Sequence, residues 1–276
     1  MRAPTVATLI AIIVVATAVA VGACSGRGIS PLAPEYEYEE DLTLSLDGSA
    51  TMTVNASVPA LIALRGLPLN ADPRVRADQV KTQVRDLYTS PYADVRRVST
   101  WTRHGRRFVG VYLRIPDIRN LPKAPPFSWA TYELRQDGEE MLFKHTLSKP
   151  PASPEDAARA GWKGNELVAF RLHLPARIRF HNSRYYDTNQ VRDASRGNIL
   201  TWEQRLGDRL AGKPIGYAQD TKPDVMEVRM DKESILYRTL WLFALAFVAA
   251  VAVLGGLIWL TMRRAPADPP TSSLPQ

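Results

Sequence analysis

The side chains that could do chemistry are few and far apart. The chain has four histidines, His104, His145, His173 and His181, and they stand in unrelated contexts. Acid–base or nucleophilic catalysis needs groups that converge on one point, and no hydrolase, metalloprotease or phosphate-loop motif surrounds any of the four. A zinc site needs closely spaced His and Cys ligands, which four scattered histidines and one cysteine do not supply. We therefore expect a protein that is not an enzyme and that has no metal and no cofactor.

Two further groups of residues leave a binding role open. The acidic pairs Glu37/Glu39 and Glu139/Glu140 alternate along a strand pattern or flank a turn, which is typical of solvent-facing residues rather than of a general acid and base. Three aromatic residues, Tyr185, Tyr186 and Trp202, either line a pocket or belong to the core.

The most distinctive charged stretch surrounds a predicted turn. Arg96, Arg97, Arg103, Arg106 and Arg107 lie within twelve residues. Guanidinium groups pair well with phosphate oxygens, so Arg103, Arg106 and Arg107 are the candidate contacts for lipid head groups. The alternative is that these charges only keep an exposed strand from aggregating.

The formal net charge of +7 is spread over 276 residues and lacks the dense basic stripe that nucleic-acid binding favours. We expect no nucleic-acid partner. The expected ligands are membrane lipids, either anionic phospholipid or glycolipid, and a protein partner in the cell envelope is a further possibility.

The single cysteine closes an apolar N-terminal region. Residues 1–23 read as a signal peptide, with Arg2 before an apolar run that ends in small residues. The sequence Val21-Gly22-Ala23-Cys24 resembles the bacterial lipobox, which implies that Cys24 carries a lipid. An uncleaved anchor helix and an ordinary signal with a chance cysteine are the alternatives.

The stretch on which the whole chain depends is the uncharged run at residues 240–262, which has Trp241 and Trp259 near its ends. About 20 apolar residues cross a bilayer, so we predict a transmembrane helix at 236–262. Arg263 and Arg264 then place the tail, 263–276, in the cytoplasm and the N-terminal part outside it. The predicted location is therefore the bacterial cell membrane, with a single span.

Between a linker at 24–34 and this helix, residues 35–231 form one extracytoplasmic domain in our interpretation. Three hairpins are predicted. The first turns at Asp47-Gly48, and the alternation of apolar residues requires an odd loop that closes Ser45 on Ser49. The second turns at His104-Gly105 with Trp101 opposite Phe108. The third turns near residues 137–138.

Helices are predicted at two places. An apolar helical turn occupies residues 59–66, and a longer helix begins with Asp72 as cap and Pro73 in its first position. A last strand near residue 230 delivers the chain to the membrane through a short gap at 231–239. The predicted class is α+β: a curved antiparallel sheet built from hairpins with helices on one face, plus one C-terminal transmembrane helix.

This layout resembles the LppM-type lipoprotein family of bacterial envelopes. The resemblance is carried by the lipobox, the C-terminal helix, and the strand patterns at residues 42–48 (LTLSLDG), 174–182 (LPARIRFHN) and 197–202 (GNILTW). It implies a helix-grip, START-like fold around a cavity and the binding of polar lipids. Residues 116–164 depart from the pattern, so no ligand residue is carried over.

Location gives the same expectation by a separate route, since a domain tethered near a bilayer meets lipid at high effective concentration. We expect a domain that binds or presents polar lipids, with the basic hairpin holding head groups and the Tyr, Met and Leu interior taking acyl chains. The alternative is a non-catalytic scaffold that contacts an envelope partner.

Overall fold

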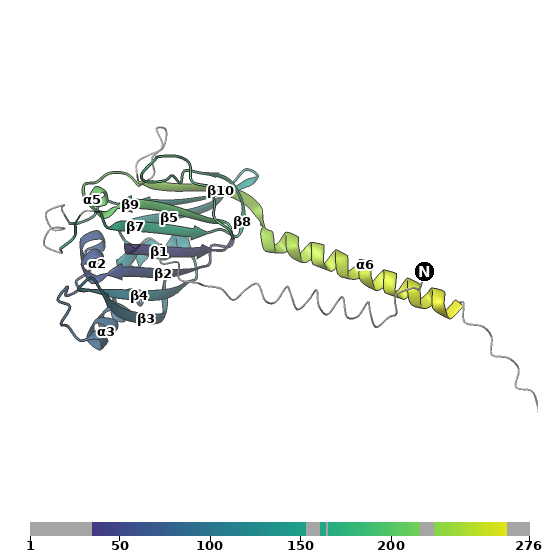
Figure 1. Ribbon diagram of the computed structural model, residues 1–276, viewed down its shortest axis with the longest axis horizontal. Helices are drawn as coiled ribbons and strands as arrows, with labels where there is room; N and C mark the ends of the chain where they lie inside the picture. Colours follow the sequence, from purple (N-terminus) through teal and green to yellow (C-terminus); the bar gives the residue numbers. More distant parts are fainter. Residues whose placement is uncertain (1–34, 153–160, 164, 216–223, 264–276) are drawn as a thin grey trace, which may run out of the picture. The chain divides into compact units, whose positions relative to one another are not determined.

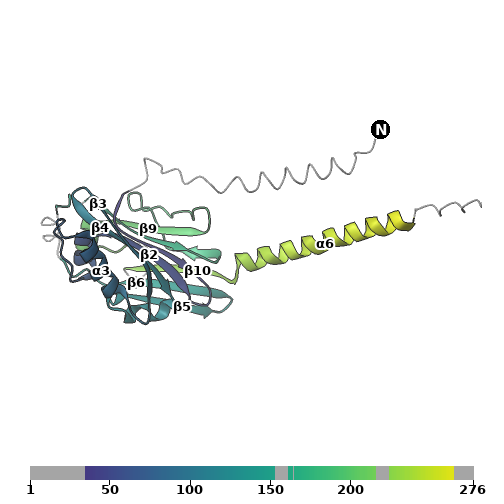
Figure 2. The same cartoon turned by 90° about the horizontal axis from the view of Figure 1, so that it is seen from below.

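The structure, a computed structural model, describes residues 35–152, 161–163, 165–215 and 224–263. Its strands form two sheets (Figures 1 and 2). The six-stranded sheet has the order β3 (Asp94–Arg103), β4 (Arg106–Ile115), β2 (Ala50–Ser57), β1 (Tyr36–Leu44), β7 (Leu167–His173) and β9 (Ile199–Arg205). The four-stranded sheet has the order β5 (Ala130–Asp137), β6 (Glu140–Leu147), β10 (Val225–Ser234) and β8 (Ala176–His181).

The helices are short except for the last one. They are α2 (Val58–Arg65), α3 (Ala77–Tyr88), α5 (Leu206–Leu210) and α6 (Ile235–Arg263), with 3-10 turns η2 (Ile118–Lys123) and η3 (Pro125–Phe127). The predicted α+β class with mostly antiparallel strands and one long apolar C-terminal helix is confirmed. The strands divide between two sheets, however, and β1 pairs with β7 in parallel.

The predicted hairpin registers are found in the structure. At the first turn the Ser45 amide donates to the Ser49 carbonyl over 2.9 Å, and Gly48 has φ 95°, a backbone conformation that glycine adopts without steric cost. At the second turn Trp101 is opposite Phe108. In each case a period-two pattern with one buried face fixes the register, because a slip of one residue would turn that face to solvent.

One of the two helix predictions agrees with the structure, and the other gives the wrong start. In α2 the Ser57 hydroxyl accepts from the Ala60 amide over 3.2 Å, and the helix ends at Gly66 with φ 66°. The predicted start of α3 is wrong. The Asp72 carboxylate accepts from the Arg74 amide over 2.9 Å, so Asp72 closes a turn of its own, and the helix begins later, at Ala77.

The core lies between the facing sides of the two sheets. Side chains such as Met52 and Leu113 from the six-stranded sheet and Phe143 and Met230 from the four-stranded sheet are almost fully buried in one cluster. Burial of this apolar surface is the main stabilising contribution to the fold.

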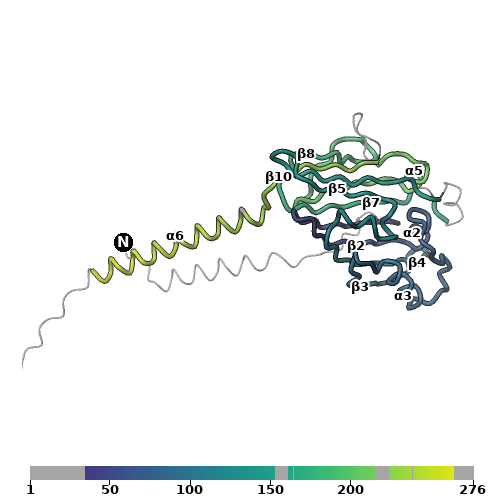
Figure 3. Tube along the Cα trace, turned by 180° about the vertical axis from the view of Figure 1, so that it is seen from behind, coloured from purple at the N-terminus to yellow at the C-terminus, as the bar shows by residue number. Residues whose placement is uncertain are grey.

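The gap predicted before the membrane helix is wrong, because β10 continues to Ser234 and α6 begins at the next residue (Figure 3). The Ile235 amide also donates to the Pro175 carbonyl over 2.9 Å. The helix is long and apolar enough to cross a membrane, with a mean hydropathy of 2.5 in its most apolar window. The strand that carries α6 is therefore hydrogen-bonded into a sheet up to the start of the helix.

Strand directions tell which turns lie near that junction. β6 and β8 run antiparallel to β10, and β7 leads into β8 through two residues, so β7 ends near α6. Since β1 is parallel to β7, the β1–β2 turn and the end of β4 lie at this same end, which we call the α6 end. The β3–β4 turn lies at the opposite end.

Candidate functional site

The three arginines predicted to contact head groups make contacts within the protein. The Arg106 guanidinium pairs with the nearly buried Glu37 carboxylate. Arg103 donates to the Tyr36 carbonyl and lies over the Phe108 ring. Arg107 donates to the carbonyls of Pro73 and Val75 over 3.0 and 3.4 Å. All three belong to the β3–β4 hairpin, at the end of the sheet far from α6, so contact between these arginines and head groups stays a prediction.

The histidines do not converge. His104 is in the β3–β4 turn, His145 is buried on β6, His173 is on β7 with Nε2 2.9 Å from Asp41 Oδ1, and His181 ends β8. In the described part of the chain no group of three or more His, Cys, Asp or Glu side chains is arranged to hold a metal ion. Cys24 lies outside the described residues.

The aromatic candidates separate into two kinds. Trp202 is 1% exposed, and its Nε1 donates to Asn182 Oδ1 over 3.0 Å. Tyr185 and Tyr186 are exposed, at 40% and 44%. Of the two readings left open by the sequence, the core is the right one for Trp202.

A buried ion pair crosses the middle of the core. Glu40 on β1 and Arg65 at the end of α2 are 2.7 Å apart, and both side chains are 3% exposed. The Arg65 guanidinium lies over the Trp129 and Tyr38 rings, and the Tyr38 hydroxyl hydrogen-bonds to both members of the pair. Burial raises the pKa of Glu40, and the Arg65 cation opposes that shift.

Beside this pair lies the buried His145, whose ring stacks on Tyr132 with centroids 4.2 Å apart. Burial holds the pKa of His145 well below its ordinary value, and the Arg65 and Arg209 cations lower it further. A neutral imidazole is therefore the form that this interior favours.

One cavity lies between the sheets, and it is small. A cavity of about 20 Å³ is bordered by side chains of both sheets, including Glu40, His145, Phe170 and Met226. That volume corresponds to about one water molecule, whereas ligand pockets usually measure about 300–1,000 Å³. This cavity is too small for an acyl chain, and the expectation that the interior takes acyl chains stays a prediction.

A larger space opens on the outer side of the six-stranded sheet, at the α6 end. We call it the hydroxyl groove. It measures about 430 Å³, and its lining residues are Thr43, Ser45, Ser49, Ala50, Thr51, Arg114, Ile115 and Pro116.

The hydroxyl groove combines a cation with hydrogen-bonding hydroxyls. Arg114 is exposed and has no ion-pair or hydrogen-bond partner among the described residues. The Ser49 hydroxyl donates to Asp47 over 2.7 Å, which holds the pKa of that carboxyl below its ordinary value. The hydroxyls of Thr43 and Thr51 make no side-chain hydrogen bond within the described chain. One guanidinium with several hydroxyls is a donor set suited to a phosphate or carboxylate group.

The hydroxyl groove is close to the start of α6. Thr43 pairs with His173, and Pro175, two residues further along, accepts the hydrogen bond from Ile235, the first residue of the helix. One strand spacing of about 4.8 Å, two residues at about 3.3 Å each and one hydrogen-bonded contact put the groove within about 20 Å of that residue.

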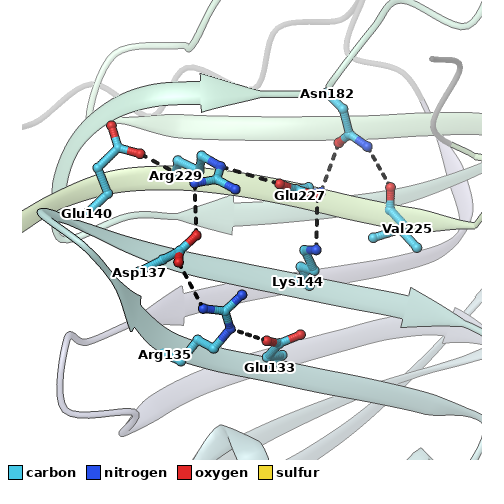
Figure 4. A network of polar contacts seen from close by, with 9 residues as sticks. All are labelled: Glu133, Arg135, Asp137, Glu140, Lys144, Asn182, Val225, Glu227 and Arg229. Atoms are coloured by element: carbon cyan, nitrogen blue, oxygen red, sulfur yellow. Dashed lines mark hydrogen bonds and ion pairs between the residues drawn. The ribbon is translucent and has the colours of Figure 1, made fainter. Parts of the chain in front are cut away.

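On the outer face of the four-stranded sheet, charged side chains of β5, β6 and β10 are paired with one another (Figure 4). Arg229 on β10 is 3.0 Å from Asp137 and 3.5 Å from Glu227, and Lys144 is 3.4 Å from the same glutamate. These pairs connect β10 to the β5–β6 hairpin at the base of α6. Each exposed pair contributes little energy, but together they occupy the charged side chains of these three strands.

Two features were missed at the level of sequence. Tyr38, Glu40 and Leu42 alternate along β1 and all face the core. An acidic residue at a core-facing position indicates that a buried cation pairs with it, and the sequence offered this signal. Arg114 shares the outward face of β4 with Tyr112, and its strand register with Thr51 follows from the hairpins. No sequence pattern marks its lack of a partner.

The fold and the groove define a class of protein: an α+β domain with a polar groove, joined without a linker to a helix that could span a membrane. No protein-family model and no curated protein sequence matches the chain. Among solved structures, the NMR structure of the folded domain of Mycobacterium tuberculosis LppM is similar, with a TM-score of 0.37 and 12% identity, over 75% of this chain and 95% of that one. This is a distant likeness of fold and carries no argument about function.

Proposed function

We propose that this chain is a single-pass membrane protein of the bacterial envelope whose extracytoplasmic domain binds the anionic head groups of polar lipids in the hydroxyl groove. The observation that carries the proposal is the unpartnered Arg114 among hydroxyls at the α6 end of the sheet. The head group would be held there while the acyl chains stay in the bilayer; the cavity between the sheets that Glu40 and His145 border, of about 20 Å³, is too small for them.

The continuity of β10 and α6 supports this arrangement. Without a linker, the domain has little freedom to move away from the surface in which α6 is anchored. The groove then meets head groups at high effective concentration, so a weak individual interaction is enough for high occupancy. Arg263, which ends α6, would lie on the cytoplasmic side.

The test uses the full chain in an uncharged detergent, because α6 would insert into any vesicle and hide the effect of the groove. We expect dihexanoyl-phosphatidylglycerol to bind in a calorimetric titration, and dihexanoyl-phosphatidylcholine, with the same acyl chains and no net charge, to bind at least about tenfold more weakly. Arg114→Gln should lower the affinity for phosphatidylglycerol about tenfold, the value of one charge-assisted hydrogen bond at the low end of its range.

A matched control separates this site from general attraction. Arg177 is also exposed, has no partner among the described residues, and follows Ala176, the first residue of β8, which pairs with Ser234 at the same end of the domain. Arg177→Gln removes the same charge and should leave the affinity unchanged. Equal losses in the two variants, or no difference between the two lipids, would contradict the proposal, and a domain that binds neither lipid would favour the scaffold role.

A further inference from the structure

The outer face of the six-stranded sheet carries a second group of side chains, further from α6 than the hydroxyl groove. In one row across the strands, Ser99 on β3 and Asn55 on β2 both pair with Gly110 on β4. A Cβ on Gly110 would lie 2.7 Å from the Ser99 hydroxyl oxygen, 3.0 Å from Asn55 Oδ1 and 3.2 Å from the Trp101 indole. Three side chains therefore converge where Gly110 leaves the sheet uncovered.

The Trp101 indole is held in place and open to solvent. It stacks on Phe108, with ring centroids 5.6 Å apart and 21° between the planes, and the Arg103 guanidinium also lies over Phe108. Phe108 is 1% exposed, whereas Trp101 is 37% exposed. The indole N–H has no hydrogen-bond partner in the described part of the chain. A ring fixed in this way loses little freedom when a ligand stacks on it.

The next row towards α6 adds a second ring. Tyr112 on β4 is also 37% exposed, and it pairs with Arg97 on β3. It is two residues from Gly110, or about 7 Å along the strand. Arg97 is exposed and has no ion-pair or hydrogen-bond partner among the described residues. We call this surface the aromatic strip, and its residues are Trp101, Tyr112, Gly110, Ser99, Asn55 and Arg97.

The aromatic strip combines two rings with an amide, a hydroxyl and one guanidinium. A pyranose ring with equatorial hydroxyls has faces of C–H groups, which pack on an aromatic ring as other apolar surfaces do. The hydroxyls at its edge donate and accept hydrogen bonds, and Asn55 Oδ1 can accept from the N–H of an acetamido group. Two rings at neighbouring outward positions suit a strand of sugars rather than a single sugar.

Other occupants suit the aromatic strip less well. A stable protein partner buries about 800 Å² on each side around an apolar core, whereas the strip offers two partly exposed rings among polar groups. Aromatic residues also favour membrane interfaces. Trp101, however, is opposite Phe108, which lies about 20 Å along β4 from Arg114 in the hydroxyl groove. The strip therefore leads away from the α6 end.

We propose that the aromatic strip binds an uncharged glycan strand, with sugar rings packed on Trp101 and Tyr112 and the polar groups of the sugars hydrogen-bonded to Asn55 and Arg97. The proposal takes α6 as the membrane anchor, as the proposed function does, but it does not depend on the hydroxyl groove. Its ligand is a polymer outside the membrane, whereas the groove would hold the head group of a lipid within it.

The experiment is a calorimetric titration of the full chain with chitotetraose, a soluble uncharged strand of N-acetylglucosamine, in an uncharged detergent without a sugar head group. We expect chitotetraose to bind, and Trp101→Ala and Tyr112→Ala each to weaken binding about tenfold. Tyr112 makes no ring contact or side-chain hydrogen bond within the described residues. Its variant therefore reports on the strip even where Trp101→Ala disturbs the packing over Phe108.

Two control variants locate the site. Tyr186→Ala removes a ring of similar exposure, 44%, from the loop between β8 and β9, and Arg114→Gln removes the cation of the hydroxyl groove. Both should bind chitotetraose as the unmodified protein does. No binding of chitotetraose, or an equal loss in Tyr186→Ala, overturns the proposal and leaves the groove untouched. A loss in Arg114→Gln would place the sugar in the groove and also overturns it.

A second probe separates a glycan from a protein partner. An octaproline peptide is titrated in parallel, because extended proline-rich segments also pack on exposed aromatic rings. We expect it to bind at least about tenfold more weakly than chitotetraose. Tighter binding of the peptide that is lost in Trp101→Ala would assign the aromatic strip to a protein partner and overturn the proposal.

Discussion

Replacing Arg65 by methionine tests the buried ion pair that crosses the core. Methionine keeps an unbranched stem but lacks the guanidinium that lies over the Tyr38 and Trp129 rings, and it leaves the Glu40 carboxylate buried without its cation. Removing one member of a buried pair costs about 3–5 kcal/mol. We therefore expect Arg65→Met to lower the free energy of unfolding by that amount at pH 7.5.

The pH dependence of this loss identifies its cause. Burial already raises the pKa of Glu40, and without Arg65 the folded-state pKa rises further, so the folded protein binds a proton that the unfolded chain releases near pH 4.3. Stability from such a group is fully present below the unfolded pKa and is lost as pH rises through the folded one. At pH 4.5 the loss caused by Arg65→Met should be smaller by at least about 2 kcal/mol, since one pKa unit is worth about 1.4 kcal/mol.

The assay is urea unfolding of the full chain in uncharged detergent, followed by tryptophan fluorescence. Adding Glu40→Gln to Arg65→Met removes the unpaired charge and should recover most of the stability. Arg135→Met, which breaks an exposed pair with Glu133 that is 2.6 Å long, should cost less than about 0.5 kcal/mol. A loss below 1 kcal/mol for Arg65→Met, or the same loss at both pH values, would refute the reasoning.

Three other outcomes are expected. Because burial lowers the pKa of His145, the unfolded chain takes up a proton below about pH 6.5 that the folded protein does not. As the pH is lowered from 7 to 5.5, the free energy of unfolding, measured with urea, should therefore decrease more steeply than in His145→Phe, by up to about 1.4 kcal/mol per pH unit. Gly110→Ala should destabilise by about 1–3 kcal/mol in the same assay, because its Cβ would lie 3.2 Å from the Trp101 ring and 2.7 Å from a serine oxygen; a neutral change would mean that the ring gives way freely. A flexible twelve-residue insertion between Ser234 and Ile235 should leave stability unchanged and reduce the lipid retained on purification, and undiminished retention would show that closeness to α6 is not needed.

The local elements were largely predictable from the sequence. A period-two pattern with one buried face determines which residues pair, and this is why the registers of Leu42 with Met52 and of Val98 with Val111 could be expected. Helix α2 was visible because an apolar run ends at Gly66. The start of α3 was not, because an aspartate before proline serves a turn as well as it serves a helix cap.

The arrangement of the elements was less accessible. The division into two sheets depends on pairing between strands far apart in the chain, such as β1 with β7, and no local pattern records it. The same limit applies to the site. Arg103, Arg106 and Arg107 belong to a dense run of arginines, yet Glu37 and backbone carbonyls engage them. Arg114 is isolated in sequence and has no partner in the described part of the chain.

The most direct test of head-group binding in the hydroxyl groove is native mass spectrometry of the full chain, expressed in a bacterial envelope and extracted in uncharged detergent. We predict a species heavier by one anionic polar lipid, lost in Arg114→Gln and kept in Arg177→Gln. A lipid-free protein, or an adduct that survives Arg114→Gln unchanged, would contradict the proposal.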